Sequence, residues 1–180
     1  MAGKLLVGLI RGINVGTANR VSMADLRALL ESLGYANART LLNSGNVVFS
    51  DDGARKGKPA ARIEAGMASK LGVETRVVVL SGADLALIVR ENTLEATADN
   101  PSRLQVVVTA EPADVKRLAP LQRQSWGDEA LAVGSRAAYL WCPRGVTASA
   151  LFKAVGRALG DSVTARNWAT VRKLHAMIDA

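Results

Sequence analysis

The sequence predicts an α+β protein of two tandem ferredoxin-like halves with antiparallel sheets, a linking helix and a C-terminal helix. Short β-branched or apolar runs alternate with segments whose apolar residues repeat at helical spacing. The element order βαββαβ in residues 1–80 recurs, without sequence identity, in residues 103–180. Of the 180 residues, 49% are hydrophobic, which is enough for a substantial core.

The first half opens with an apolar run at residues 5–10, which is typical of a buried strand. A loop rich in Gly and Asn, residues 12–20, comes next. Ser22 with Asp25 three residues later forms a helix-start signal. The leucines that follow repeat at i, i+3, i+4 and i+7, so we expect a helix that ends in a left-handed cap at Gly34.

A hairpin, a second helix and a fourth strand complete this half. Residues 40–42 and 47–50 have strand composition and flank Asn-Ser-Gly-Asn, which favours a tight turn. Apolar residues at fourfold spacing then predict a helix ending at Gly72, and residues 75–80 are β-branched and apolar. The charged loop at residues 55–58 is expected to be solvated.

The two halves are expected to meet at a connector, residues 81–102. It begins with a linking helix capped by Ser81 and Asp84 and ends in a polar stretch before Pro101. Residues 1–80 and 101–180 each carry 11 basic and 6 acidic side chains, whereas residues 81–100 carry one and four. Two basic halves therefore flank an acidic connector.

The second half repeats the order of the first. We expect a strand at residues 104–109, a helix from Pro112, two strands joined by a turn at Gly134, a helix from Thr147 to Gly160, a short strand at residues 162–165 and a final helix at residues 167–178.

Chain direction predicts where the polar turns of the first half lie. Right-handed crossovers in a βαββαβ unit give the strand order 4-1-3-2, in which the first and third strands are antiparallel neighbours. The loop at residues 12–20 and the turn at residues 43–46 then share one end of the sheet. We expect these two distant turns to touch or nearly touch.

This meeting point is the candidate ligand site. Glycines let the backbone approach a ligand, arginines clamp phosphate or carboxylate groups, and asparagines add neutral donors and acceptors. The same residue types are also ordinary turn formers, and neither a GxGxxG fingerprint nor a P-loop is present. The candidate ligand-binding residues are Arg11, Gly12, Asn14, Gly16, Asn19, Arg20, Asn43, Ser44, Gly45 and Asn46.

The composition of the chain indicates which classes of partner it could bind. The net charge of +7 and a pI of about 10.1 favour an anionic small molecule or nucleic acid. Aromatic residues make up only 4%, which counts against base stacking. The single Cys excludes an intramolecular disulfide, and one Cys with one His offers no metal-ligand spacing. Neither a metal nor a cofactor is therefore expected. Without a membrane segment or signal peptide, a cytoplasmic protein is expected.

Three separated motifs resemble one family. They are Arg-Gly-Ile-Asn-Val-Gly at residues 11–16 with the segments that follow it, Ser-Gly-Asn-Val-Val-Phe at residues 44–49, and Thr-Ala-Arg-Asn-Trp at residues 164–168. Together they resemble the uncharacterised family called domain of unknown function 1697. The resemblance implies tandem ferredoxin-like parts, supplies no activity, and adds Arg166, Asn167 and Trp168 as candidate site residues. Where the family pattern has Gly-Lys, this chain has Thr17 and Ala18, which removes one phosphate-binding group.

Three functions remain open at this level. The first is a binding module for a phosphate-bearing, nucleotide-like or nucleic acid ligand. The second is a small-molecule enzyme in which Arg and Asn stabilise a charged transition state. The third is a protein-interaction scaffold. The candidate residues include no carboxylate, His or Lys to move protons, so binding is favoured over catalysis.

Overall fold

The computed structural model describes residues 3–179, which form two compact units. The first unit contains residues up to Ala83 together with a short C-terminal segment from Ala176, and the second is Asp84–His175. Each unit holds one four-stranded antiparallel sheet, with the orders β2-β3-β1-β4 and β6-β7-β5-β8. The α+β class and the ferredoxin-like strand order predicted from sequence are therefore confirmed.

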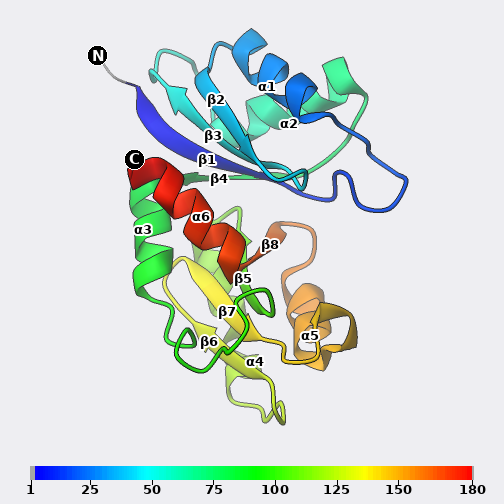
Figure 1. Cartoon of the computed structure of the whole chain (residues 1–180), viewed down its shortest axis with the longest axis vertical. Coiled ribbons are helices and arrows are strands. Elements are labelled where there is room, and N and C mark those ends of the chain that lie inside the picture. The colour runs from blue at the N-terminus through cyan, green and yellow to red at the C-terminus, as the bar shows by residue number, and fades with distance from the viewer. Residues whose placement is uncertain (1–2, 180) are drawn as a thin grey trace. The chain divides into compact units, whose positions relative to one another are not determined.

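The first unit follows the expected order of elements (Figure 1). They are β1 (Lys4–Ile10), α1 (Met23–Ser32), β2 (Ala36–Leu41), β3 (Asn46–Asp51), α2 (Pro59–Leu71) and β4 (Val77–Ser81), after which α3 (Gly82–Arg90) begins.

Both helices of this unit pack on one face of its sheet (Figure 1). Phe49 of β3 is fully buried between side chains of the two helices such as Leu30 and Met67. The helices approach closely at Gly66, where an added Cβ would lie 3.0 Å from Leu29 Cδ1. The expected cap at Ser22 is present, because its side chain accepts a hydrogen bond from the Asp25 amide.

The strand register places the end of β1 beside the hairpin turn. Leu9 is paired with Asn46, and the main-chain amide of Ile10 donates to the carbonyl of Gly45 at 2.8 Å. The convergence of the two turns, inferred from chain direction, is confirmed.

One strand of the hairpin differs from its expected bounds. β2 begins at Ala36 rather than at residue 40, and Leu42 lies outside it with a left-handed φ of 57°. The register shifts between Ala36 and Arg39, and Asn37 between them also has a positive φ of 56°. This bulge interrupts the alternation of side chains, so the strand pattern was not visible in the sequence.

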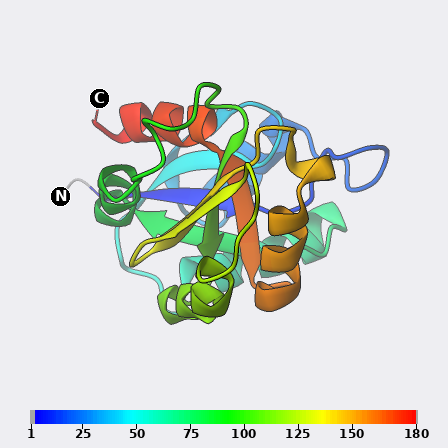
Figure 2. The ribbon, with the colours of Figure 1, turned by 90° about the horizontal axis from the view of Figure 1, so that it is seen from below.

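The second unit repeats the architecture (Figure 2). Its elements are β5 (Leu104–Thr109), η1 (Pro112–Leu118), α4 (Ala119–Gln122), β6 (Ala130–Val133), β7 (Ala137–Trp141), η2 (Val146–Ala148), α5 (Ala150–Leu159), β8 (Val163–Asn167) and the first part of α6 (Trp168–Asp179).

Two helices of the second unit differ from expectation. The helix at Pro112 is a 3₁₀ helix followed by the single turn of α4. The helix expected from Thr147 begins at Ala150, because the side chain of Ser149 caps it by accepting from the Phe152 amide at 2.8 Å.

No helix within residues 3–179 is long and apolar enough to cross a membrane.

Candidate functional site

The loop between β1 and α1 is held against the β2–β3 turn by one asparagine. The Asn14 Nδ2 donates to the carbonyl oxygens of Asn43 at 2.7 Å and of Val21 at 2.8 Å. Its Oδ1 accepts from the amide of Val21 at 2.9 Å. Both donor hydrogens are thus used within the protein. Asn14 therefore holds the loop against the turn and has no side-chain N–H left to donate.

The β2–β3 turn is tightly constrained. Gly45 has φ 81°, and an added Cβ would lie 2.8 Å from the carbonyl oxygen of Ile10. Asn46 is fully buried, and its Nδ2 donates to the carbonyl of Leu41 and to Ser44 Oγ, both at 3.0 Å. Gly45 and Asn46 therefore stabilise the turn, and their role in the candidate site is structural.

An open pocket of about 530 Å³ lies where the loop and the turn meet. Its volume is within the range of small-molecule sites. The residues that line it come from the loop, the start of α1 and the turn: Asn14, Arg20, Val21, Ser22, Met23 and Asn43.

Arg20 is the positive group of this pocket. Its side chain is exposed, and no residue in the described range 3–179 gives it a hydrogen-bond or ion-pair partner. The pocket also includes Ser22 and Met23 at the start of α1, where the helix dipole favours an anion. Asp25 in the first turn opposes this field, and its carboxylate accepts from Ser22 Oγ at 2.7 Å.

The remaining loop candidates lie outside the pocket lining. The main chain of Arg11 is hydrogen-bonded to the two residues that precede β4: its amide donates to the carbonyl of Arg76, and its carbonyl accepts from Thr75 Oγ1. Gly12 and Gly16, with φ of 66° and 63°, are exposed and let the loop bend. Asn19 Nδ2 reaches the carbonyl of Gly12 over 3.4 Å. Figure 1 shows the loop as a blue trace extending away from the sheet.

The three C-terminal candidates belong to the second unit. Trp168 is almost fully buried, and its Nε1 donates to Glu95 at 3.1 Å. Asn167, expected in the final helix, ends β8 instead, and its Oδ1 accepts from the amide of Thr170 at 2.9 Å. Burial of Arg166 on β8 lowers the pKa of its guanidinium to about 10. Trp168, Asn167 and Arg166 therefore each contact other residues of the second unit.

The equivalent hairpin turn of the second unit contains an anion from the chain itself. The Glu91 carboxylate accepts hydrogen bonds from the amide of Ser135 at 2.8 Å and from its hydroxyl at 2.9 Å. A Cβ on Gly134 would lie 2.6 Å from Glu91 Oε2. This turn is therefore filled by a carboxylate, whereas the corresponding turn of the first unit faces an open pocket.

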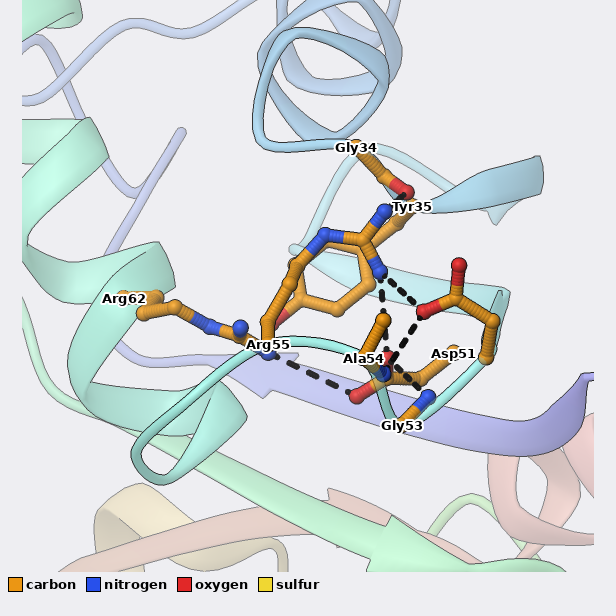
Figure 3. Close-up of polar contacts among 8 residues, drawn as sticks. Gly34, Tyr35, Asp51, Gly53, Ala54, Arg55 and Arg62 are labelled. Atoms are coloured by element: carbon orange, nitrogen blue, oxygen red, sulfur yellow. Dashed lines mark hydrogen bonds and ion pairs between the residues drawn. The ribbon is translucent and has the colours of Figure 1, made fainter.

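A second polar cluster in the first unit was not anticipated from the sequence (Figure 3). Tyr35 is buried, and the guanidinium carbons of Arg55 and Arg62 lie 5.5 Å and 5.1 Å from its ring centre. Arg62 also donates to the Tyr35 hydroxyl at 2.6 Å. Burial raises the pKa of Tyr35, while the hydrogen bond and charge of Arg62 oppose the shift.

Acidic residues complete this cluster. Asp51 pairs with Arg55 at 3.3 Å and with Arg62 at 3.5 Å, and Asp52 pairs with Arg55 at 2.6 Å. Arg55 also donates to the carbonyl of Gly34, in the loop between α1 and β2 (Figure 3). Arg55 was expected to be solvated, but it fixes the β3–α2 loop onto Tyr35.

Arg20 is the one titratable side chain among the lining residues of the pocket. The lining residues of the pocket include no carboxylate, His, Cys or Lys. Among residues 3–179, no three His, Cys, Asp or Glu side chains gather in a way that would hold a metal ion.

The profile of a family described as "Protein of unknown function (DUF1697)" matches residues 4–139, which include the loop, the turn and the pocket. The chain belongs to this family. A solved structure from Streptococcus pneumoniae, titled as the conserved bacterial protein SP0830, is similar to it at 25% identity and a TM-score of 0.78. That match covers 97% of this chain and 98% of the other. A comparison with curated proteins finds no match.

Proposed function

We propose that this member of the DUF1697 family binds a phosphate-bearing small molecule in the pocket between the β1–α1 loop and the β2–β3 turn. The observation that carries the proposal is the guanidinium of Arg20, which is exposed at an open pocket without a partner among residues 3–179. Arginine suits phosphate because its planar donors match two oxygens at once.

Two further features support an anionic ligand. The pocket reaches the start of α1, where the helix dipole favours negative charge and the carboxylate of Asp25 offsets part of that field. In the second unit, the equivalent turn at Ser135 already holds the carboxylate of Glu91.

The residues that line the pocket have different roles in the proposed binding. Arg20 supplies charge, the side chain of Asn43 supplies neutral hydrogen bonds, and Asn14 holds the loop and turn in place. The hydroxyl of Ser22 is used as the helix cap, since it accepts from the amide of Asp25 and donates to the carboxylate of the same residue. The proposed role is binding without turnover.

The test is calorimetric titration of the full chain with inorganic phosphate and pyrophosphate. Arg20→Ala should weaken binding at least about tenfold, because a charge-assisted hydrogen-bond pair is lost. Arg123→Ala is the matched control: Arg123 is an exposed arginine of the second unit, and its removal changes net charge equally. Equal binding by the two variants, or no binding by the wild type, would refute the proposal.

Salt dependence separates a small ligand from nucleic acid. A nucleic acid backbone neutralised by several basic residues gives an affinity that falls steeply with salt, whereas a single phosphate gives a shallow slope. Single-stranded RNA that binds with a steep slope and is insensitive to Arg20→Ala would show that the basic surface, and not this pocket, is the binding site.

A further inference from the structure

Two large hydrophobic side chains are exposed in the described part of the chain, residues 3–179. They are Val15, which is 70% exposed, and Leu42, which is 55% exposed. Exposed apolar residues gathered at one place are a common mark of a binding surface. These two belong to different turns of the first unit, one in the β1–α1 loop and one in the β2–β3 turn.

Both residues flank the hydrogen bond that joins the two turns. Val15 follows Asn14 and Leu42 precedes Asn43, and Asn14 Nδ2 donates to the carbonyl of Asn43 at 2.7 Å. Asn14 and Asn43 line the pocket, so Val15 and Leu42 are each one residue from its lining.

Leu42 is also in an unfavourable backbone conformation. Its φ is 57°, whereas the other residues with positive φ in the described range 3–179 are glycines and asparagines, which tolerate it. Asparagine at this position would remove the strain and the exposed apolar surface together. The leucine side chain stays 55% exposed, so burial offsets little of this strain, which points to a role outside the folding of the chain.

We infer that Val15 and Leu42 bind the apolar part of the ligand, so that the ligand is an organic phosphate with an aliphatic or similarly apolar group. This inference rests on the proposed function. Val21 and Met23 add apolar surface to the lining, next to Arg20 at the polar side. A ligand with an anionic end and an apolar end matches both kinds of surface.

The dimensions favour a small molecule over a macromolecule. An open pocket of about 530 Å³ has the volume of a small-molecule site.

The experiment compares inorganic phosphate, butyl phosphate and hexyl phosphate by calorimetry with the full chain. Wild-type affinity should rise about twofold or more per added methylene, because each one leaves water. Leu42→Asn should remove most of this rise and leave the Kd of inorganic phosphate within about twofold. Leu42→Met should keep the rise. The melting temperature of Leu42→Asn should equal or exceed that of the wild type.

The outcomes are distinguishable. Phosphate binding that depends on Arg20 but not on alkyl length would overturn this inference and leave the proposed function standing. An identical rise in wild type and Leu42→Asn would overturn it too. If no phosphate compound binds, both fail. If Leu42→Asn alters only the sedimentation of the protein, Leu42 contacts another copy of the chain and the inference is wrong.

Discussion

The side-chain amide of Asn14 donates to the main-chain carbonyl of Asn43 at 2.7 Å, across 29 residues of sequence. The same amide group exchanges two hydrogen bonds with Val21. One side chain therefore sets the distance between the β1–α1 loop and the β2–β3 turn, and with it the width of the pocket.

Asn14→Gly should lower the free energy of unfolding by about 2–3 kcal/mol, since three hydrogen bonds are lost at roughly 1 kcal/mol each. Glycine keeps the left-handed backbone at φ 56°, so strain does not contribute. Urea unfolding measures the loss. The control is Asn19→Gly at φ 51°, which gives up one long contact of 3.4 Å and should cost less than about 1 kcal/mol. Equal losses would contradict the role given to Asn14.

Gly45→Ala should destabilise the protein by more than about 2 kcal/mol. The new Cβ would meet the Ile10 carbonyl at 2.8 Å, in addition to the cost of a left-handed alanine. Gly16→Ala is the comparison, because Gly16 has a similar positive φ and open space around it, and only about 1 kcal/mol should be lost there. Thermal unfolding of the two variants gives the destabilisation of each, and the difference between them is the cost of the steric clash. Similar destabilisation in both would show that the hairpin shifts to relieve the clash.

Local patterns predicted most of the first unit for physical reasons. Ser22 followed by Asp25 marks a helix start because the hydroxyl satisfies an unpaired amide, and α1 begins there. Gly72 ends α2 with φ 67°, as a left-handed cap requires. The meeting of the two turns followed from chain direction alone, since antiparallel neighbours bring the end of one strand to the start of the next.

The rest depended on features that no local pattern carries. Ser149 rather than Thr147 caps α5, because both are good caps and only tertiary packing decides between them. The chemistry of the candidate site was visible as residue types, but not its division into pocket and scaffold. That Asn46 is fully buried, and that Arg20 lines the pocket while Arg11 does not, follows from three-dimensional placement.

Arg55→Ala should cost about 1–3 kcal/mol of unfolding free energy. It removes the ion pairs to Asp51 and Asp52, the bond to the Gly34 carbonyl and the contact with the Tyr35 ring. The neighbouring Lys56→Ala, at an exposed position, should stay within about 0.5 kcal/mol of the wild type. Urea unfolding in low salt compares the two, and a neutral Arg55→Ala would mean that the loop is held by other contacts.

Cys142 should make the stability of the protein sensitive to alkaline pH. Burial raises the pKa of its thiol above the ordinary value of 9.0, more than the hydrogen bond to Ser149 lowers it. A raised pKa stabilises the folded state fully below about pH 9, and this stabilisation is lost as the pH rises further. Unfolding free energy between pH 7 and pH 10 should fall more steeply for the wild type than for Cys142→Ala.

The thiol should also react slowly with Ellman's reagent in the native state and rapidly in urea, because Cys142 is fully buried. Fast labelling of the folded protein, or parallel pH profiles for the wild type and Cys142→Ala, would show that the thiol is accessible to solvent.

The main-chain hydrogen bond that closes the β1–α1 loop has a consequence for engineering. The main-chain amide of Asn14 donates to the carbonyl of Asn19 at 3.1 Å, so residues 15–18 form a tip that starts and ends at one bond. Insertions between those anchors would leave the strand register untouched, whereas a one-residue slip of β3 against β1 would turn Val47 and Phe49 out of the core. Residues 15–18 can therefore be replaced by other sequences on an unchanged sheet.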